Sequence, residues 1–110
     1  PQSCISIRRK NFIKIINNIN YKLFPDIWMD FRIAMYLIHV SKNFFILEQN
    51  LTYYRQSANM ISSEFSFFSI SWLKRRMQAH NYVKYFFLKQ KITYQKNLDY
   101  FLTSFINIFI

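Results

Sequence analysis

Glycine is absent from this sequence, and its absence rules out the common glycine-rich nucleotide sites. An average protein of 110 residues would contain roughly seven or eight glycines, whereas this chain has none. Glycine supplies positive φ angles and lets the backbone approach a phosphate closely. A phosphate-binding loop of the Walker or dinucleotide type is therefore excluded.

Cysteine and long apolar runs are also scarce. A single cysteine, Cys4, excludes an internal disulfide and a cysteine-based zinc site. His39 and His80 are too far apart in the sequence to suggest a metal-binding pair. No apolar run approaches the ~20 residues that cross a bilayer. Because Lys14 interrupts the first apolar stretch, we expect no signal peptide.

Basic and aromatic residues are abundant instead. Fifteen Lys and Arg against five Asp and Glu give a net charge of +10. Such a charge attracts nucleic acid, anionic lipid or a phosphorylated substrate. The basic residues are spread along the chain, with one tight cluster at Lys74, Arg75 and Arg76. Hydrophobic residues make up 52% of the chain and aromatic residues 21%, which is enough for one core and too much for a disordered chain.

The first half of the chain alternates between short elements and loops. Residues 4–7 are typical of a short strand and residues 10–16 of a short helix, and an Asn-rich loop follows that Pro25 closes. A longer helix is predicted from residue 26 to about residue 42. Asp26 is expected at or near its N-cap, where a carboxylate meets free backbone N–H groups. The apolar face of this helix comprises Ile27, Phe31, Ala34, Met35 and Ile38.

The second half ends in two predicted helices. Residues 44–47 and 51–56 are short, aromatic-rich segments that indicate strands. After a polar loop, a long helix is predicted from residue 65 to about 90 and another from about 93 to the end. Arg76 falls within the apolar arc of the long helix, so it would snorkel, pair with an acid or face a site. We therefore expect a helix-dominated α+β fold with two or three short strands.

Three segments in this order resemble family-2 glycosyltransferases of the inverting GT-A type. Residues 24–34, FPDIWMDFRIA, are similar to the acidic start of a helix that carries the catalytic base in that family. Residues 51–62, LTYYRQSANMIS, resemble the family's tyrosine–arginine segment, and residues 3–9, SCISIRR, resemble the strand before the acidic helix. The resemblance covers residues 3 to about 63.

This resemblance implies a fold, a reaction and a set of site residues. Residues 1–63 would be the C-terminal part of a glycosyltransferase catalytic domain, whose strands join a larger sheet, and residues 64–110 a helical extension. The family transfers a sugar from a nucleotide diphosphate to an acceptor hydroxyl with inversion. Asp26 would be the general base, and Arg55 would approach the diphosphate. Trp28, Asp30 and Tyr54 would bind the acceptor or the sugar.

The departures from the family are as informative as the matches. The nucleotide-binding half with its Asp-rich motif is missing, since no Asp-x-Asp occurs in these residues. The complete enzyme would use Mg²⁺ or Mn²⁺, and we expect this fragment alone to bind no metal and to be inactive. Ser57 stands where the family often has a histidine after Arg-Gln, which leaves that histidine's role unfilled.

Each proposed role has an ordinary structural alternative. Asp26 could simply cap a helix, and Asp30 could pair with Arg32 or Lys22. Arg55 could form a structural salt bridge with Asp26, Asp30 or Glu48. The rings of Trp28 and Tyr54 could pack in the core. Lys74, Arg75 and Arg76 could rest on an anionic membrane or form a solvated helix face.

Two further hypotheses compete with the glycosyltransferase fragment. The chain could be a small basic helical module that binds a membrane surface or nucleic acid without catalysis, and it could be a remnant that aggregates through uncovered apolar faces. With the glycosyltransferase as the leading hypothesis, the partners are a nucleotide-sugar donor and a glycan or lipid-linked acceptor. Nucleic acid is not expected. The predicted location is the cytoplasm, at the inner face of the membrane.

Overall fold

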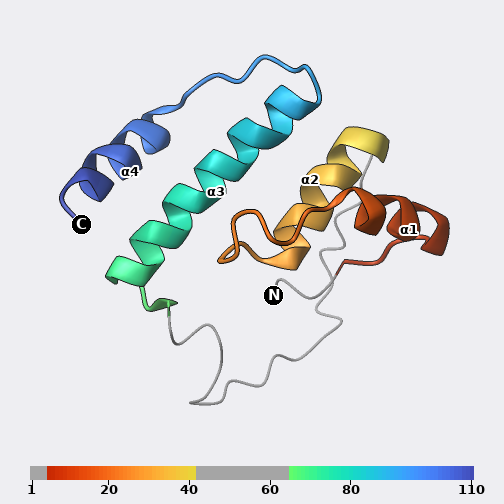
Figure 1. Ribbon diagram of the computed structural model, residues 1–110, viewed down its shortest axis with the longest axis horizontal. Helices are drawn as coiled ribbons and strands as arrows, with labels where there is room; N and C mark the ends of the chain where they lie inside the picture. The colour runs from red at the N-terminus through yellow and green to blue at the C-terminus, as the bar shows by residue number, and fades with distance from the viewer. Residues whose placement is uncertain (1–4, 42–64) are drawn as a thin grey trace, which may run out of the picture. The chain divides into compact units, whose positions relative to one another are not determined.

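The computed structural model describes residues 5–41 and 65–110, and within these ranges all regular structure is helical. The chain divides into two compact units, Pro1–Gln56 and Ser57–Ile110, and each is described by itself. In the first unit α1 packs with α2, and in the second α3 packs with α4 (Figure 1). The helices are α1 (Arg9–Asn18), α2 (Met29–Ser41), α3 (Ile70–Lys89) and α4 (Leu98–Ile108).

The predicted α+β fold is therefore wrong, because the described part of the chain is a small all-helical structure. Residues 5–7, most of the predicted first strand, lie outside any strand, and Arg8, which follows them, is extended at the start of α1. An extended segment becomes a strand only when another segment pairs with it. The predicted strands at 44–47 and 51–56, and the boundary expected at residue 63, lie outside the described residues.

Helix α1 confirms the short helix predicted at residues 10–16. Ile15 is its buried residue, with 2% of its surface exposed. The helix ends where the backbone N–H of Ile19 donates to the carbonyls of Ile15 and Ile16. The Asn18 side chain also donates to the Lys14 carbonyl at 2.8 Å, which satisfies one of the last carbonyls of the helix.

Helix α2 begins at Met29, three residues later than predicted, and ends within one residue of the prediction. The delay arises from a turn in which the Ile27 N–H donates to the Phe24 carbonyl, with Phe24 in the left-handed region at φ 59°. The predicted apolar face is partly wrong. Ile38 is 51% exposed, whereas Arg32 and Tyr36, both polar, are buried.

Helix α3 begins at Ile70, five residues later than predicted. Residues 65–69 form a turn instead, with Phe68 at φ 64°, and Ser69 caps the helix by accepting from the Trp72 N–H. At the other end the N–H groups of Lys91 and Ile92 donate to carbonyls in the last turn. Lys91 adopts φ 56°, the left-handed geometry that usually selects glycine at this position.

Helix α4 is shorter than the predicted final helix. Residues 92–97 form a connecting segment, and Asn97 caps the helix by accepting from the Tyr100 N–H at 2.8 Å. Burial raises the pKa of Tyr94 in this segment, with a smaller contribution from Tyr100. The cap explains why the helix begins at Leu98, since an asparagine side chain competes well for free helix N–H groups.

Candidate functional site in the loop before helix α2

The loop between α1 and α2 is organised by one buried side chain, Arg32. Only 2% of Arg32 is exposed, and its guanidinium donates to three backbone carbonyls of the loop. Nη1 bonds to the Asn20 carbonyl at 2.8 Å, and Nη2 bonds to the carbonyls of Leu23 at 2.8 Å and Phe24 at 2.5 Å. Hydrogen bonds from a charged donor are stronger than neutral ones. The guanidinium therefore fixes the path of the loop.

Tyr36 adds a second attachment one helical turn further along α2. Its hydroxyl donates to the Asn18 carbonyl at 2.9 Å. Residues four apart on a helix lie on the same face, so Arg32 and Tyr36 present one polar face of α2 to the loop and to the end of α1. We call these two residues the loop anchor.

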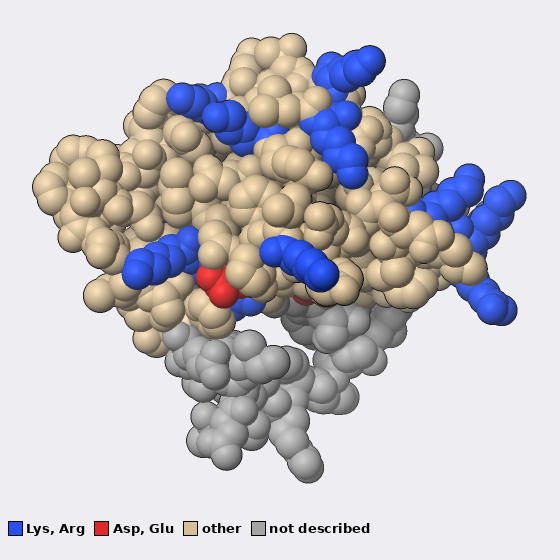
Figure 2. Space-filling view, viewed as in Figure 1, with Lys and Arg blue, Asp and Glu red and all other residues tan. Residues whose placement is uncertain are grey.

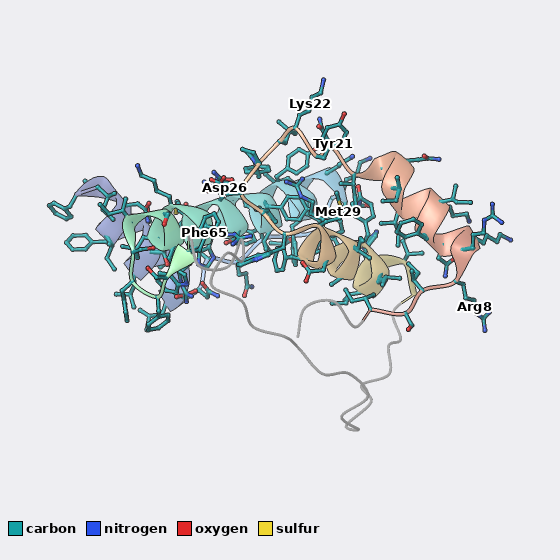
Figure 3. All side chains as sticks on the ribbon, turned by 90° about the horizontal axis from the view of Figure 1, so that it is seen from below. Arg8, Tyr21, Lys22, Asp26, Met29 and Phe65 are labelled. Atoms are coloured by element: carbon teal, nitrogen blue, oxygen red, sulfur yellow. The ribbon has the colours of Figure 1, made fainter. Side chains whose placement is uncertain are left out.

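Asp26 lies in the part of the loop that the anchor shapes. It follows Phe24, whose carbonyl is held by both Arg32 and the Ile27 N–H, and it is half-buried. Figure 3 shows Tyr21 and Lys22 at the outermost point of the loop, with Asp26 on the branch that returns to Met29. Because α2 begins at Met29, Asp26 is not the N-cap residue of that helix.

The other predicted site residues are only partly described. Trp28 is half-buried immediately before α2, and Asp30 lies in the first turn, where its Oδ1 accepts from the Phe31 N–H at 2.9 Å. Asp26 precedes helix α2, whereas Asp30 lies within its first turn. Tyr54 and Arg55 lie outside the described residues.

The basic cluster of α3 is not one continuous charged patch. Lys74 is exposed, whereas Arg75 is 7% exposed and its guanidinium lies 3.9 Å from the centre of the Phe65 ring. Arg76 pairs with Asp99 of α4 through Nη2 and Oδ1 at 2.5 Å, which is one of the three roles predicted for it. Successive residues on a helix point about 100° apart, so three neighbours cannot share one contact surface.

Asp99 connects α4 to α3 through two partners. Besides Arg76, the Nε2 atom of His80 lies 3.0 Å from its Oδ2. The hydrogen bond from Arg76 is the largest cause that holds the pKa of Asp99 below its usual value of 3.8, and the charges of Arg76 and His80 add to it. Asp99 is therefore an ionised, structural carboxylate at neutral pH.

Sequence reasoning missed the loop anchor. Arg32 was considered only as a partner for Asp30, and Tyr36 was not singled out. The available signal was the spacing of Arg32 and Tyr36, which places two polar-tipped side chains four residues apart on one face of a mostly apolar helix.

Comparisons with known proteins identify no relative. No family model, no curated protein and no solved structure matches this chain. In residues 5–41 and 65–110, no three His, Cys, Asp or Glu side chains gather into a group that could hold a metal ion. The four described helices are all too short or too polar to cross a membrane.

Proposed function

We propose that this chain forms the acceptor side of an inverting glycosyltransferase, with Asp26 as the general base. The observation that carries this proposal is the position of Asp26 outside helix α2, two residues after the Phe24 carbonyl that Arg32 binds. A helix that begins at Met29 places Asp26 before the N-cap position, which supports a role other than that of the helix cap. The type of reaction is inferred from the resemblance of residues 24–34 to the acidic segment of family-2 glycosyltransferases.

The chemistry requires a carboxylate held at a fixed place. The acceptor hydroxyl oxygen attacks the anomeric carbon while its proton passes to Asp26, and the bond from that carbon to the diphosphate oxygen breaks. The electron pair leaves with the nucleoside diphosphate, and the configuration at the anomeric carbon inverts. A base acts well only within hydrogen-bond reach of the hydroxyl. Small displacements reduce the rate strongly, so an anchored loop suits this role.

The neighbouring residues have supporting roles in this proposal. Trp28 and Asp30 flank the start of α2 and would contact the acceptor, and Tyr54 would contact the sugar. Arg55 would bind the leaving diphosphate, since a guanidinium offers paired donors to phosphate oxygens. A divalent metal would neutralise the diphosphate from the nucleotide-binding part of the complete enzyme. We place the enzyme in the cytoplasm, where donors and lipid-linked acceptors meet at the inner membrane face.

The test is activity of the complete reading frame that contains this chain. Release of nucleoside diphosphate is measured with a panel of UDP-, GDP- and dTDP-sugars, with Mg²⁺ or Mn²⁺ present. Removing a general base costs about 10²- to 10⁴-fold in rate, so Asp26→Asn should lower kcat by that factor while the donor still binds. Lys22→Gln, an exposed change on the same loop, should leave kcat unchanged.

Two outcomes would contradict the assignment. If Asp26→Asn retains kcat within about threefold of the parent, the general base is another group. If the complete frame neither binds nor cleaves any donor of the panel, the chain is not part of a glycosyltransferase of this kind.

A further inference from the structure

Helix α4 packs against α3 through its polar side. Asp99 pairs with Arg76, Thr103 is 3% exposed, and the Asn107 side chain donates to the Leu73 carbonyl of α3 at 3.4 Å. Asp99, Thr103 and Asn107 are spaced four residues apart, so they form one stripe along the helix. The contact between α3 and α4 therefore includes a row of polar groups.

The apolar side of α4 points away from α3. Six large apolar side chains of α4 and its C-cap are each more than half exposed, and we call them the outer face of α4. A helix on a globular protein normally buries such a stripe and exposes its polar side, so the orientation of α4 is the reverse of the usual one. The outer face consists of Leu98, Phe101, Leu102, Phe105, Ile108 and Phe109.

Positive charge accompanies this apolar surface. Residues 65–110 contain seven Lys and Arg but a single acid, Asp99, which is paired with Arg76. The Lys96 ammonium lies 5.2 Å from the centre of the Tyr100 ring and 5.9 Å from that of Phe101, so it lies at the edge of the outer face. In Figure 2, Lys and Arg side chains project beside an extended uncharged surface. The exposed bases of this unit are Lys74, Lys84, Lys89, Lys91 and Lys96.

We infer that the outer face of α4 docks on an anionic lipid bilayer. An apolar helix face with aromatic and Leu side chains inserts into the boundary between headgroups and acyl chains, and nearby Lys side chains bind anionic lipids. Eleven helical residues span about 16 Å, so α4 would lie along the surface and not cross it. This inference is independent of the role proposed for Asp26, because it concerns the other unit.

Charge favours lipid over the other possible occupants. Two copies that met through this face would each bring six net positive charges from residues 65–110, seven bases less one acid, and these would repel. Nucleic acid would satisfy the charges but would leave the Leu and Ile side chains of the outer face in water. An anionic bilayer covers the apolar side chains and pairs with the charges at once.

The experiment is vesicle sedimentation of the full chain with matched double variants. The vesicles contain phosphatidylcholine alone or phosphatidylcholine with phosphatidylglycerol. We expect binding to the anionic vesicles that weakens as salt is raised. Phe101→Gln combined with Phe105→Gln should reduce that binding by about tenfold or more, because affinity scales with the apolar area that enters the bilayer. Ile38→Gln with Val40→Gln, equally exposed positions on α2, should bind as the parent does.

Circular dichroism of the variants and sedimentation velocity without lipid accompany these measurements. The inference is overturned if the folded Phe101/Phe105 variant binds as tightly as the parent, or if the α2 variant loses binding equally. It is also overturned if the parent sediments as a dimer that the Phe101/Phe105 variant dissociates, since the outer face would then contact a second copy. A Lys96→Gln variant should bind the anionic vesicles more weakly than the parent, and its binding to pure phosphatidylcholine vesicles should be unchanged.

Discussion

The loop anchor depends on the shape of the Arg32 side chain as well as on its charge. One guanidinium reaches three carbonyls from two nitrogens, and Nη2 alone serves two of them. A lysine ammonium has three donors but is a compact group on a flexible stem, and it cannot reproduce a planar fork. Arginine and lysine are therefore not equivalent at this position.

Replacing Arg32 with lysine should destabilise the chain while preserving its net charge. The change removes charge-assisted hydrogen bonds from the buried guanidinium to part-buried carbonyls of the loop, at a cost of about 1–3 kcal/mol. Chemical denaturation followed by circular dichroism measures this difference. Arg9→Lys, at an exposed position in α1, is the matched control and should change stability by less than about 0.5 kcal/mol. Equal stability of the two variants would show that the three hydrogen bonds do not hold the loop.

Left-handed positions are another residue-scale consequence of this glycine-free sequence. Phe24, Phe68 and Lys91 all adopt positive φ angles, where a side chain with a Cβ is strained. Lys91 shows the effect most clearly, because it follows α3 at the position where glycine usually ends a helix.

Lys91→Gly should therefore stabilise the second unit. The free energy released by removing the backbone strain exceeds the entropic cost of a glycine in the unfolded chain. We expect the free energy of unfolding to rise by about 0.5–1 kcal/mol. Lys84→Gly removes the same side chain from an exposed position inside α3 and should destabilise by about 1 kcal/mol. Thermal melting of both variants measures the contrast. Melting temperatures that fall together would mean that Lys91 is not strained.

At the scale of elements, the stability of the contact between α3 and α4 should depend on pH. Because its folded pKa lies below 3.8, Asp99 contributes stability that is fully present above that pH and is lost as the pH falls through the folded value. The side chains of Arg76 and Asp99 are 40% and 42% exposed, so solvent screens the pair and its contribution is about 0.2–1 kcal/mol.

Asp99→Asn should lower the melting temperature at pH 7, and the difference from the parent should disappear as the pH falls from 3.8 through the lower folded pKa of Asp99. Added salt should also narrow the difference at pH 7. Thermal melting by circular dichroism across this pH range is the measurement. A difference that persists unchanged in strong acid would assign the effect to packing and not to the carboxylate charge.

The existence of all four described helices could be predicted from the residue pattern, but the first residues of α2, α3 and α4 could not. Each late start reflects a local hydrogen bond that periodicity does not report, such as the Ser69 cap of α3 and the Asn97 cap of α4. The prediction of the buried face of α2 was partly wrong because Arg32 and Tyr36 are buried, and their polar groups donate to backbone carbonyls. An apolar pattern gives no information on such bonds.

At the scale of the whole molecule, the predicted α+β fold class failed because short apolar or aromatic segments indicated strands, whereas a strand also needs a pairing partner that a local pattern does not supply. Strands were expected as parts of a larger sheet, and the described residues fold as helices within two units. Of the candidate site, Asp26, Trp28 and Asp30 lie around the start of α2, as their closeness in sequence required. Arg32, six residues beyond Asp26, could be noticed from its spacing to Tyr36, but that spacing does not show that its partners are carbonyls of the loop.

Because Arg32 binds main-chain oxygens, the loop's conformation is encoded largely outside the loop itself. Every residue has a backbone carbonyl, so these three hydrogen bonds do not depend on the side chains of Asn20, Leu23 or Phe24. Substitutions at the exposed tip, Tyr21 and Lys22, should accordingly be tolerated, while position 32 should accept almost nothing else. The loop is thus free to vary in sequence without changing its path, because its conformation depends on a residue of helix α2.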